Sequence, residues 1–288
     1  MPAVRRVLFL AATAGSRRQH AACRPLRAGF GVLIAILWLA NPIQATAADD
    51  IVVIGVPAAR AEEIAAHALD VRSRAFRHLL GQKAPRPWRV PCEVVVHATA
   101  ADFAAAVGGP PAVARGATSI EFAGTDVVLR RIDVMGDGPD TIPDALAHEL
   151  VHVVLADHFT EGPPPRWADE GLAVLFDPES KQRGHQRDFD RAAGADMAWR
   201  VRDLFALENY PEEPGRQRIF YGQSAAVVRW LVDRRDAATF IRFLDDYAAI
   251  GPDEAVRRHY ALGSVAALER AWKEVPSIDT VGLAERFR

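Results

Sequence analysis

Residues 148–152 read His-Glu-Leu-Val-His, an HExxH stretch inside an apolar segment from Pro143 to His158 whose spacing predicts a helix. On a helix, positions i and i+4 face the same side, so the imidazoles of His148 and His152 can close on one metal ion. Glu149 is rotated by about 100° from His148 and lies beside that ion. From there it can take a proton from a metal-bound water.

The surroundings of this stretch predict that it is buried. Apart from the two histidines and the glutamate, nearly all positions of the helix are apolar, which is typical of a helix buried on all sides. The alternative is a surface helix with two solvated histidines, since a chance match has a probability of roughly one or two per cent. Buried imidazoles and a buried carboxylate need partners, and a metal supplies one. We expect Zn²⁺, which binds nitrogen and carboxylate ligands and lowers the pKa of bound water to roughly 7.

A catalytic zinc takes three protein ligands and keeps a fourth position open. Glu170 lies 18 residues past His152, in an apolar helical segment at 166–176 that follows three prolines. His158, six residues past His152, is the competing ligand. Metzincins use a histidine at that spacing, but their chain turns at a glycine where this sequence has Leu155. The sequence favours Glu170 and leaves His158 as the alternative.

The start of the chain has the pattern of an export leader. Residues 1–27 contain six arginines and no acid, residues 28–40 are apolar, and residues 45–47 read Ala-Thr-Ala. We expect residues 1–47 to be cleaved and the protein to be exported, to the periplasm or the extracellular space. A signal anchor is the alternative, but the apolar run is shorter than the about 20 residues that span a bilayer. We therefore expect no stable membrane span after cleavage.

The cysteines and the charge narrow the class of protein further. Cys23 lies in the predicted leader, so Cys92 would be alone after cleavage, and we expect it to be a small buried hydrophobe without a disulfide. The chain has 35 basic and 37 acidic residues and a net charge of −2. This balance gives no basic excess for nucleic acid or for an anionic membrane surface.

The rest of the sequence predicts an α+β fold. Residues 48–165 mix strands and helices and carry the HExxH helix, whereas residues 166–288 are almost all helical and carry Glu170. A short strand is expected at 127–132, just before the metal helix. We interpret it as a strand that can pair with an extended peptide.

At residues 148–152 and 165–173, the latter reading Pro-Arg-Trp-Ala-Asp-Glu-Gly-Leu-Ala, the chain resembles the peptidase MA-like gluzincins. These have HExxH on one helix and a glutamate ligand on the next, in a Trp-x-x-Glu-Gly-x-Ala context. Looser similarity extends through residues 202–205, 221–224 and 268–272. The resemblance implies a zincin-like, thermolysin-type core and a zinc peptidase acting on a peptide or protein. By position it makes His148, His152 and Glu170 the ligands and Glu149 the general base.

Two features of the expected site stay open. Thermolysin-type enzymes support a histidine ligand with an aspartate four residues after the glutamate, where this chain has Val174, so Asp144 or Asp169 is expected to act instead. Tyr221, at the start of a helix, is the candidate donor for the developing oxyanion, with simple packing as the alternative. Two rival functions remain, namely a non-catalytic binding module on a metallopeptidase fold and a zinc hydrolase of another amide, such as a cell-wall cross-link.

Overall fold

The computed structural model describes residues 4–12, 50–82, 84–108, 114–138 and 140–274. This part of the chain combines one five-stranded mixed sheet with helices, which confirms the α+β class. The strands are β1 (Val4–Ala12), β2 (Ile51–Ile54), β3 (Cys92–His97), β4 (Ala114–Ala123) and β5 (Asp126–Met135). The helices are α1 (Ala58–Leu80), α2 (Ala100–Val107), α3 (Leu146–His158), α4 (Arg166–Val174), α5 (Glu179–Gly194), α6 (Val201–Phe205), α7 (Pro214–Arg234), α8 (Ala237–Ile250), α9 (Pro252–Tyr260) and α10 (Val265–Lys273).

The sheet has the order β1-β4-β5-β3-β2. β2, β3 and β5 run parallel, and β4 is antiparallel to both β5 and β1. Residues 127–132 therefore lie in the interior strand β5, with β3 on one side and β4 on the other. For residues 130–132 the prediction that they pair with a peptide is wrong, because both of their edges already carry ladder hydrogen bonds, whereas residues 127–129 pair with β4 alone.

Local signals in the sequence set the boundaries of the first elements. Gly81 ends α1 in the left-handed region at φ 64°, which a glycine adopts without a Cβ penalty. Thr99 caps α2 by accepting a hydrogen bond from the amide of Asp102. Gly124, at φ 68°, makes the tight turn between β4 and β5.

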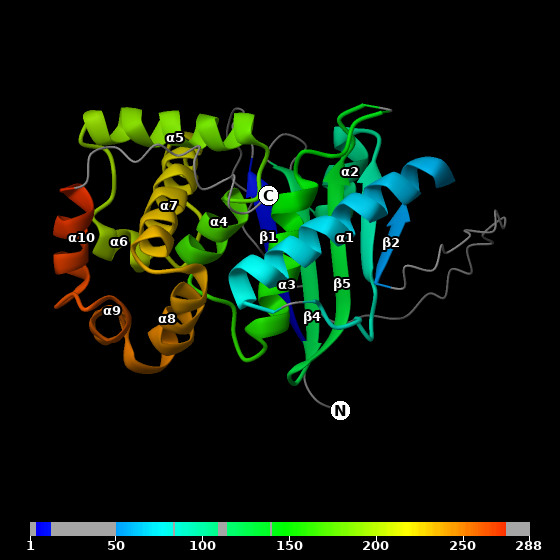
Figure 1. Cartoon of the computed structure of the whole chain (residues 1–288). Helices are drawn as coiled ribbons and strands as arrows, with labels where there is room; N and C mark the ends of the chain where they lie inside the picture. The colour runs from blue at the N-terminus through cyan, green and yellow to red at the C-terminus, as the bar shows by residue number, and fades with distance from the viewer. Residues whose placement is uncertain (1–3, 13–49, 83, 109–113, 139, 275–288) are drawn as a thin grey trace, which may run out of the picture.

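Figure 1 shows α1 and α3 lying across one face of the sheet, with α4 to α10 gathered into a separate helical half beside it. Residues 146–155 of α3 are all buried, as the apolar sequence on every side of this helix predicts. α3 thus sits at the centre of the molecule, between the sheet and the helical half. β1 forms the edge of the sheet that faces that half (Figure 1).

α4 is fixed against the helical half by close packing. A Cβ built on Gly171 would lie 2.4 Å from Cγ2 of Val228 and 2.7 Å from the carbonyl oxygen of Ser224, both on α7. The ring of Trp167 is fully buried and stacks on Phe205 at 4.0 Å between centroids. These contacts set the position from which α4 presents its acidic residues to α3.

The structure adds three helices that the apolar spacing does not predict. α5 buries only Gln182 and Ala192, α9 is short and rich in charge, and α6 has five residues. α5 and α9 contain few apolar residues and α6 is too short to show a period, so a search for apolar spacing misses them. Cys92 is fully buried, and burial raises the pKa of its thiol to about 12, which confirms the expected structural role.

The N-terminal residues contribute a strand that the leader prediction does not foresee. Val4–Ala12, part of the predicted leader, pairs with β4 as β1. Residues 13–49, which contain the apolar run at 28–40, the Ala-Thr-Ala stretch and Cys23, lie outside the described residues. None of the helices in the described ranges combines the length and the apolar character that crossing a membrane requires.

Candidate metal centre

The HExxH helix brings two imidazoles together. His148 and His152 lie one turn apart on α3, and their ring centroids are 5.1 Å from each other. Their side chains are 1% and 0% exposed. Because a helix repeats every 3.6 residues, the i, i+4 spacing places both rings on one side of α3, and the packing of the helices turns that side toward α4.

α4 adds the carboxylate of Glu170 to the pair. Oε2 of Glu170 lies 3.1 Å from Nε2 of His148 and 3.8 Å from Nε2 of His152. One ligand atom from each of the three residues lies within 4.8 Å of the others, and all three side chains are buried. This His-His-Glu group could hold a metal ion.

Each imidazole is backed by a second carboxylate on its other nitrogen. Oδ2 of Asp177 lies 3.3 Å from Nδ1 of His148, and Oδ2 of Asp169 lies 3.1 Å from Nδ1 of His152. The contact at His148 is a hydrogen bond and the one at His152 is an ion-pair contact. A carboxylate at Nδ1 favours the N–H on that nitrogen and leaves the lone pair on Nε2, which is the nitrogen that faces Glu170. Both rings are thereby oriented as metal ligands.

The charges around the imidazoles favour a cation at the centre. Burial alone would lower the pKa of His148, but the charge of Asp177 and hydrogen bonds to Asp177 and Glu170 raise it above its ordinary value. The pKa of His152 is likewise raised against burial, by the charges of Asp169 and Glu170. Burial would raise the pKa of Glu170, yet the two imidazoles hold it below its usual range. The site thus stabilises positive charge in a region that excludes water.

Glu149 lies beside the ligand set and is held by β4. The hydroxyl of Thr118 donates to Oε2 of Glu149 at 2.8 Å and also approaches the carbonyl oxygen of the same residue at 3.0 Å. Oε1 of Glu149 is buried and has no hydrogen-bond partner among the described residues. Burial, partly offset by the two imidazoles, raises the pKa of Glu149. A carboxylate with a raised pKa and an unused oxygen is suited to accept a proton.

β4 approaches Glu149 so closely that only glycine fits at one position. A Cβ built on Gly116 would lie 2.5 Å from Oε1 of Glu149 and 2.8 Å from Cβ of Ala145. A methyl group there would have to displace the carboxylate. The missing side chain therefore leaves room for the conformation of Glu149 in which Thr118 holds it.

Two tyrosines lie next to the ligands. The hydroxyl of Tyr210 donates to Oε1 of Glu170, and its ring lies 6.2 Å from that of Tyr221. Tyr221, on α7, is 3% exposed, and its ring centroid lies 6.4 Å from that of His148. The structure thus brings the predicted Tyr221 into the wall of the site. Tyr210, in the loop before α7, places its hydroxyl in contact with Glu170.

The competing residues lie elsewhere. His158 is on the outside of α3, and its Nε2 lies 2.9 Å from Oδ1 of Asp245 on α8. Asp144 is exposed, and its backbone amide donates to Asp137. Of the two aspartates considered as support for a histidine, Asp169 is in place and Asp144 is not.

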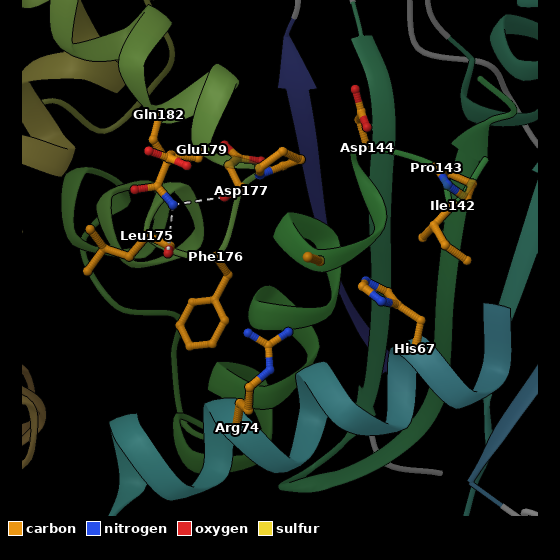
Figure 2. Close-up of a pocket in the computed structure, with 12 residues that line it drawn as sticks. His67, Arg74, Ile142, Pro143, Asp144, Leu175, Phe176, Asp177, Glu179 and Gln182 are labelled. Carbon is orange, nitrogen blue, oxygen red and sulfur yellow. Dashed lines mark hydrogen bonds between the residues drawn. The ribbon is translucent and has the colours of Figure 1, made fainter. Parts of the chain in front are cut away.

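A pocket of about 300 Å³ lies where α1, the segment before α3 and the end of α4 meet, and Figure 2 shows the side chains that line it. Its lining comes from α1, from the segment that leads into α3 and from the junction of α4 and α5: His67, Arg74, Ile142, Pro143, Asp144, Ala147, Leu175, Phe176, Asp177, Pro178, Glu179 and Gln182. Of the carboxylates that contact the imidazoles, Asp177 lines it. The pocket therefore meets the site at the carboxylate that contacts Nδ1 of His148, and its lining includes none of the three residues of the His-His-Glu group.

Three residues of the site have no counterpart in the sequence prediction: Thr118, Asp177 and Tyr210. Thr118 lies on β4, and its role depends on the packing of the sheet on α3. Tyr210 lies in a loop with no local pattern. Asp177 is the only one of the three with a signal in the sequence. It is an acidic residue three positions after Val174, the position at which the resembled family has its supporting aspartate.

Comparison of the chain with protein-family models, with curated proteins and with solved structures gave no match. The argument for a metal rests on the residues themselves. Two imidazoles, each oriented through Nδ1, converge with a carboxylate in a buried space, and further carboxylates surround them. This donor set and its charge fit a divalent transition metal.

Proposed function

We propose that this chain is a zinc-dependent peptidase with a zincin-like, gluzincin-type site. The observation that carries the proposal is the buried convergence of His148, His152 and Glu170 with Glu149 immediately beside them. Bound zinc would supply an activated water and a Lewis acid for the scissile carbonyl. The two histidines and Glu170 are the residues that hold it, and the protein is proposed to act after export.

Glu149 is the proposed proton carrier. Thr118 fixes one oxygen of its carboxylate, which leaves the other free to accept a proton from the attacking water and then to pass it to the leaving amine. Its raised pKa suits both transfers, because a stronger base accepts the proton more readily near neutral pH. Tyr210 and Tyr221 are the two hydroxyls close enough to the ligand set to be tested as oxyanion donors.

Metal analysis of the exported protein, with its N-terminus mapped by mass spectrometry, tests the site. We expect about one zinc per chain in the wild type and in His158→Ala, and little in Glu170→Ala. His158→Ala is the matched control, because it removes a histidine near the same helix that contacts Asp245 instead. Zinc lost from His158→Ala and kept in Glu170→Ala would overturn the ligand set.

A cleavage profile separates the peptidase from its rivals. Wild type and Glu149→Gln are compared on a proteome-derived peptide library and on cross-linked cell-wall fragments. Glu149→Gln should keep its zinc and lose hydrolysis by a factor of at least about 10², the scale of general base catalysis. Hydrolysis of the cell-wall amide alone would assign the second class of substrate. Peptide binding without hydrolysis in the wild type would assign a binding module.

A further inference from the structure

The strand β1 occupies the position next to the site that an extended peptide would need. β4 pairs with β5 on one side and with β1 on the other, so β1 covers the only edge of β4 that β5 leaves open. In the β1–β4 register, Ala11 is opposite Gly116 and Phe9 is opposite Thr118. Gly116 and Thr118 are the β4 residues that contact Glu149. The backbone of β1 therefore lies one strand away from the two β4 residues that contact the proposed general base.

β1 also closes the gap between the sheet and the end of the metal helix. Val7 lines a space of only about 10 Å³ together with His152 and Asp169. That volume is no more than one water molecule needs. On this side of the site, β1 stands where a chain from outside would have to enter, and the ligands and Glu149 are at most 1% exposed.

The side chains of Val4 to Val7 hold β1 by the packing of Val7 against the core, by Arg5 over the ring of Phe122, and by polar contacts of Arg5 and Arg6 near the surface. The guanidinium of Arg5 donates to the carbonyl oxygens of Thr160 and Glu161, just past the end of α3, at 2.8 and 3.2 Å. Arg6 donates to the hydroxyl of Ser119 at 3.1 Å, and its side chain is 60% exposed. Contacts of this kind are screened by water and salt. Apart from these contacts, β1 is attached through its backbone ladder with β4, which does not depend on side-chain identity.

We propose that β1 is a removable cover. While β1 pairs with β4 it keeps the site closed, and its departure bares the β4 edge so that an extended peptide can take its place in the same antiparallel orientation. The second half of this inference rests on the proposed peptidase function. The predicted leader, residues 1–47, contains the whole of β1, so cleavage of that leader would remove the cover for good.

A cross-link between the two strands tests the cover in the full chain. Arg6 and Glu121 are directly opposite each other, and their side chains are 60% and 31% exposed. Opposed residues in an antiparallel pair lie within the Cα separation that a disulfide bridges. Arg6→Cys/Glu121→Cys is made in a Cys23→Ser background, and the oxidised and reduced forms are compared. The two single-cysteine variants are the controls, and reduction should change neither of them.

Two readouts do not require activity. One is hydrogen exchange of the β4 amides, and the other is the rate at which a chelator removes zinc from the loaded protein. We expect the oxidised form to exchange its β4 edge amides and to lose zinc at least about tenfold more slowly than the reduced form. Arg5→Ala, which removes the bonds to residues 160 and 161 without a cross-link, should move both rates in the opposite direction. Equal rates of amide exchange and of zinc loss in all these forms would refute the proposal that β1 is a cover.

Peptide hydrolysis then separates this inference from the proposed function. Hydrolysis that is absent when the pair is oxidised and appears on reduction supports both. If the cross-link slows amide exchange and zinc loss but no form hydrolyses peptides, the proposal that β1 is a cover is supported and the proposed peptidase function is refuted. Equal hydrolysis by the oxidised and reduced forms overturns the cover and leaves the peptidase standing. A synthetic peptide of residues 4–12 should also inhibit the leader-free protein competitively.

Discussion

The two aspartates behind the imidazoles should set the affinity for the metal, and removing their charge measures how much. Asp169 contacts Nδ1 of His152 at 3.1 Å, and its second carboxylate oxygen has no partner among the described residues. Asp177 contacts His148 at 3.3 Å but shares its charge with Lys181, whose Nζ lies 2.7 Å from the other oxygen. Loss of such an outer partner typically weakens metal binding about 10- to 100-fold. We expect both asparagine variants within that range, with Asp169→Asn the weaker binder.

The measurement is an equilibrium competition for zinc against a chromogenic chelator at fixed pH and ionic strength. The expected loss corresponds to about 1.4–2.8 kcal/mol of binding free energy. Asp144→Asn is the control, because Asp144 carries the same charge near the same helix but is exposed, and the carboxylates at Nδ1 of the two site imidazoles are Asp177 and Asp169. Wild-type affinity in both test variants would refute the assignment, as would an equal loss in Asp144→Asn.

Two further predictions concern β4 and β5. Gly116→Ala should displace Glu149, because the new Cβ would lie 2.5 Å from its Oε1. We expect retained zinc, strongly reduced hydrolysis and a loss of about 1–3 kcal/mol in the free energy of unfolding, whereas Gly162→Ala, with open space around its Cβ, should change none of these. Burial would raise the pKa of Asp133, but hydrogen bonds from Arg131 and a histidine hold it below its ordinary value. Its contribution to stability is thus present above about pH 4 and is lost as the pH falls through the lower folded value. In acid denaturation monitored by circular dichroism, Asp133→Asn should lose less stability below about pH 4 than the wild type, and an unchanged slope would contradict the assignment.

The sequence predicts the centre of the site because its geometry is local. The i, i+4 spacing of His148 and His152 fixes the relation of the two rings on any helix, whatever surrounds it. Glu170 also follows from local features, a helix after three prolines and the glycine beside it. That Gly171 lies against α7 is a tertiary fact, but the small residue it requires is visible in the sequence.

The sequence analysis does not identify Asp177, because the end of α4 changes from α-helical to 3₁₀ hydrogen bonding. The amides of Leu175, Phe176 and Asp177 donate to the carbonyl oxygens of residues 172, 173 and 174, three residues back. Such a 3₁₀ turn has three residues per turn, so Asp177 comes round to the side of Val174. Position 174 is where the resembled family has its supporting aspartate. Counting at the α-helical period from Glu170 reaches Val174 and misses Asp177, whereas a search that allows one 3₁₀ turn would find it.

The start of the chain shows why a pattern can predict one role and miss another. Residues 4–12 combine apolar side chains with Arg5 and Arg6, a composition that suits the basic start of an export leader. The same composition suits an edge strand, in which apolar residues pack inward and charged ones meet water. Composition cannot separate the two, because the partner strand is more than 100 residues away in the sequence. The two roles differ in how long the segment stays with the protein, because an edge strand remains paired with β4 whereas a leader is removed by cleavage. Exchange of the β4 amides before and after cleavage of the leader therefore decides which role governs the site.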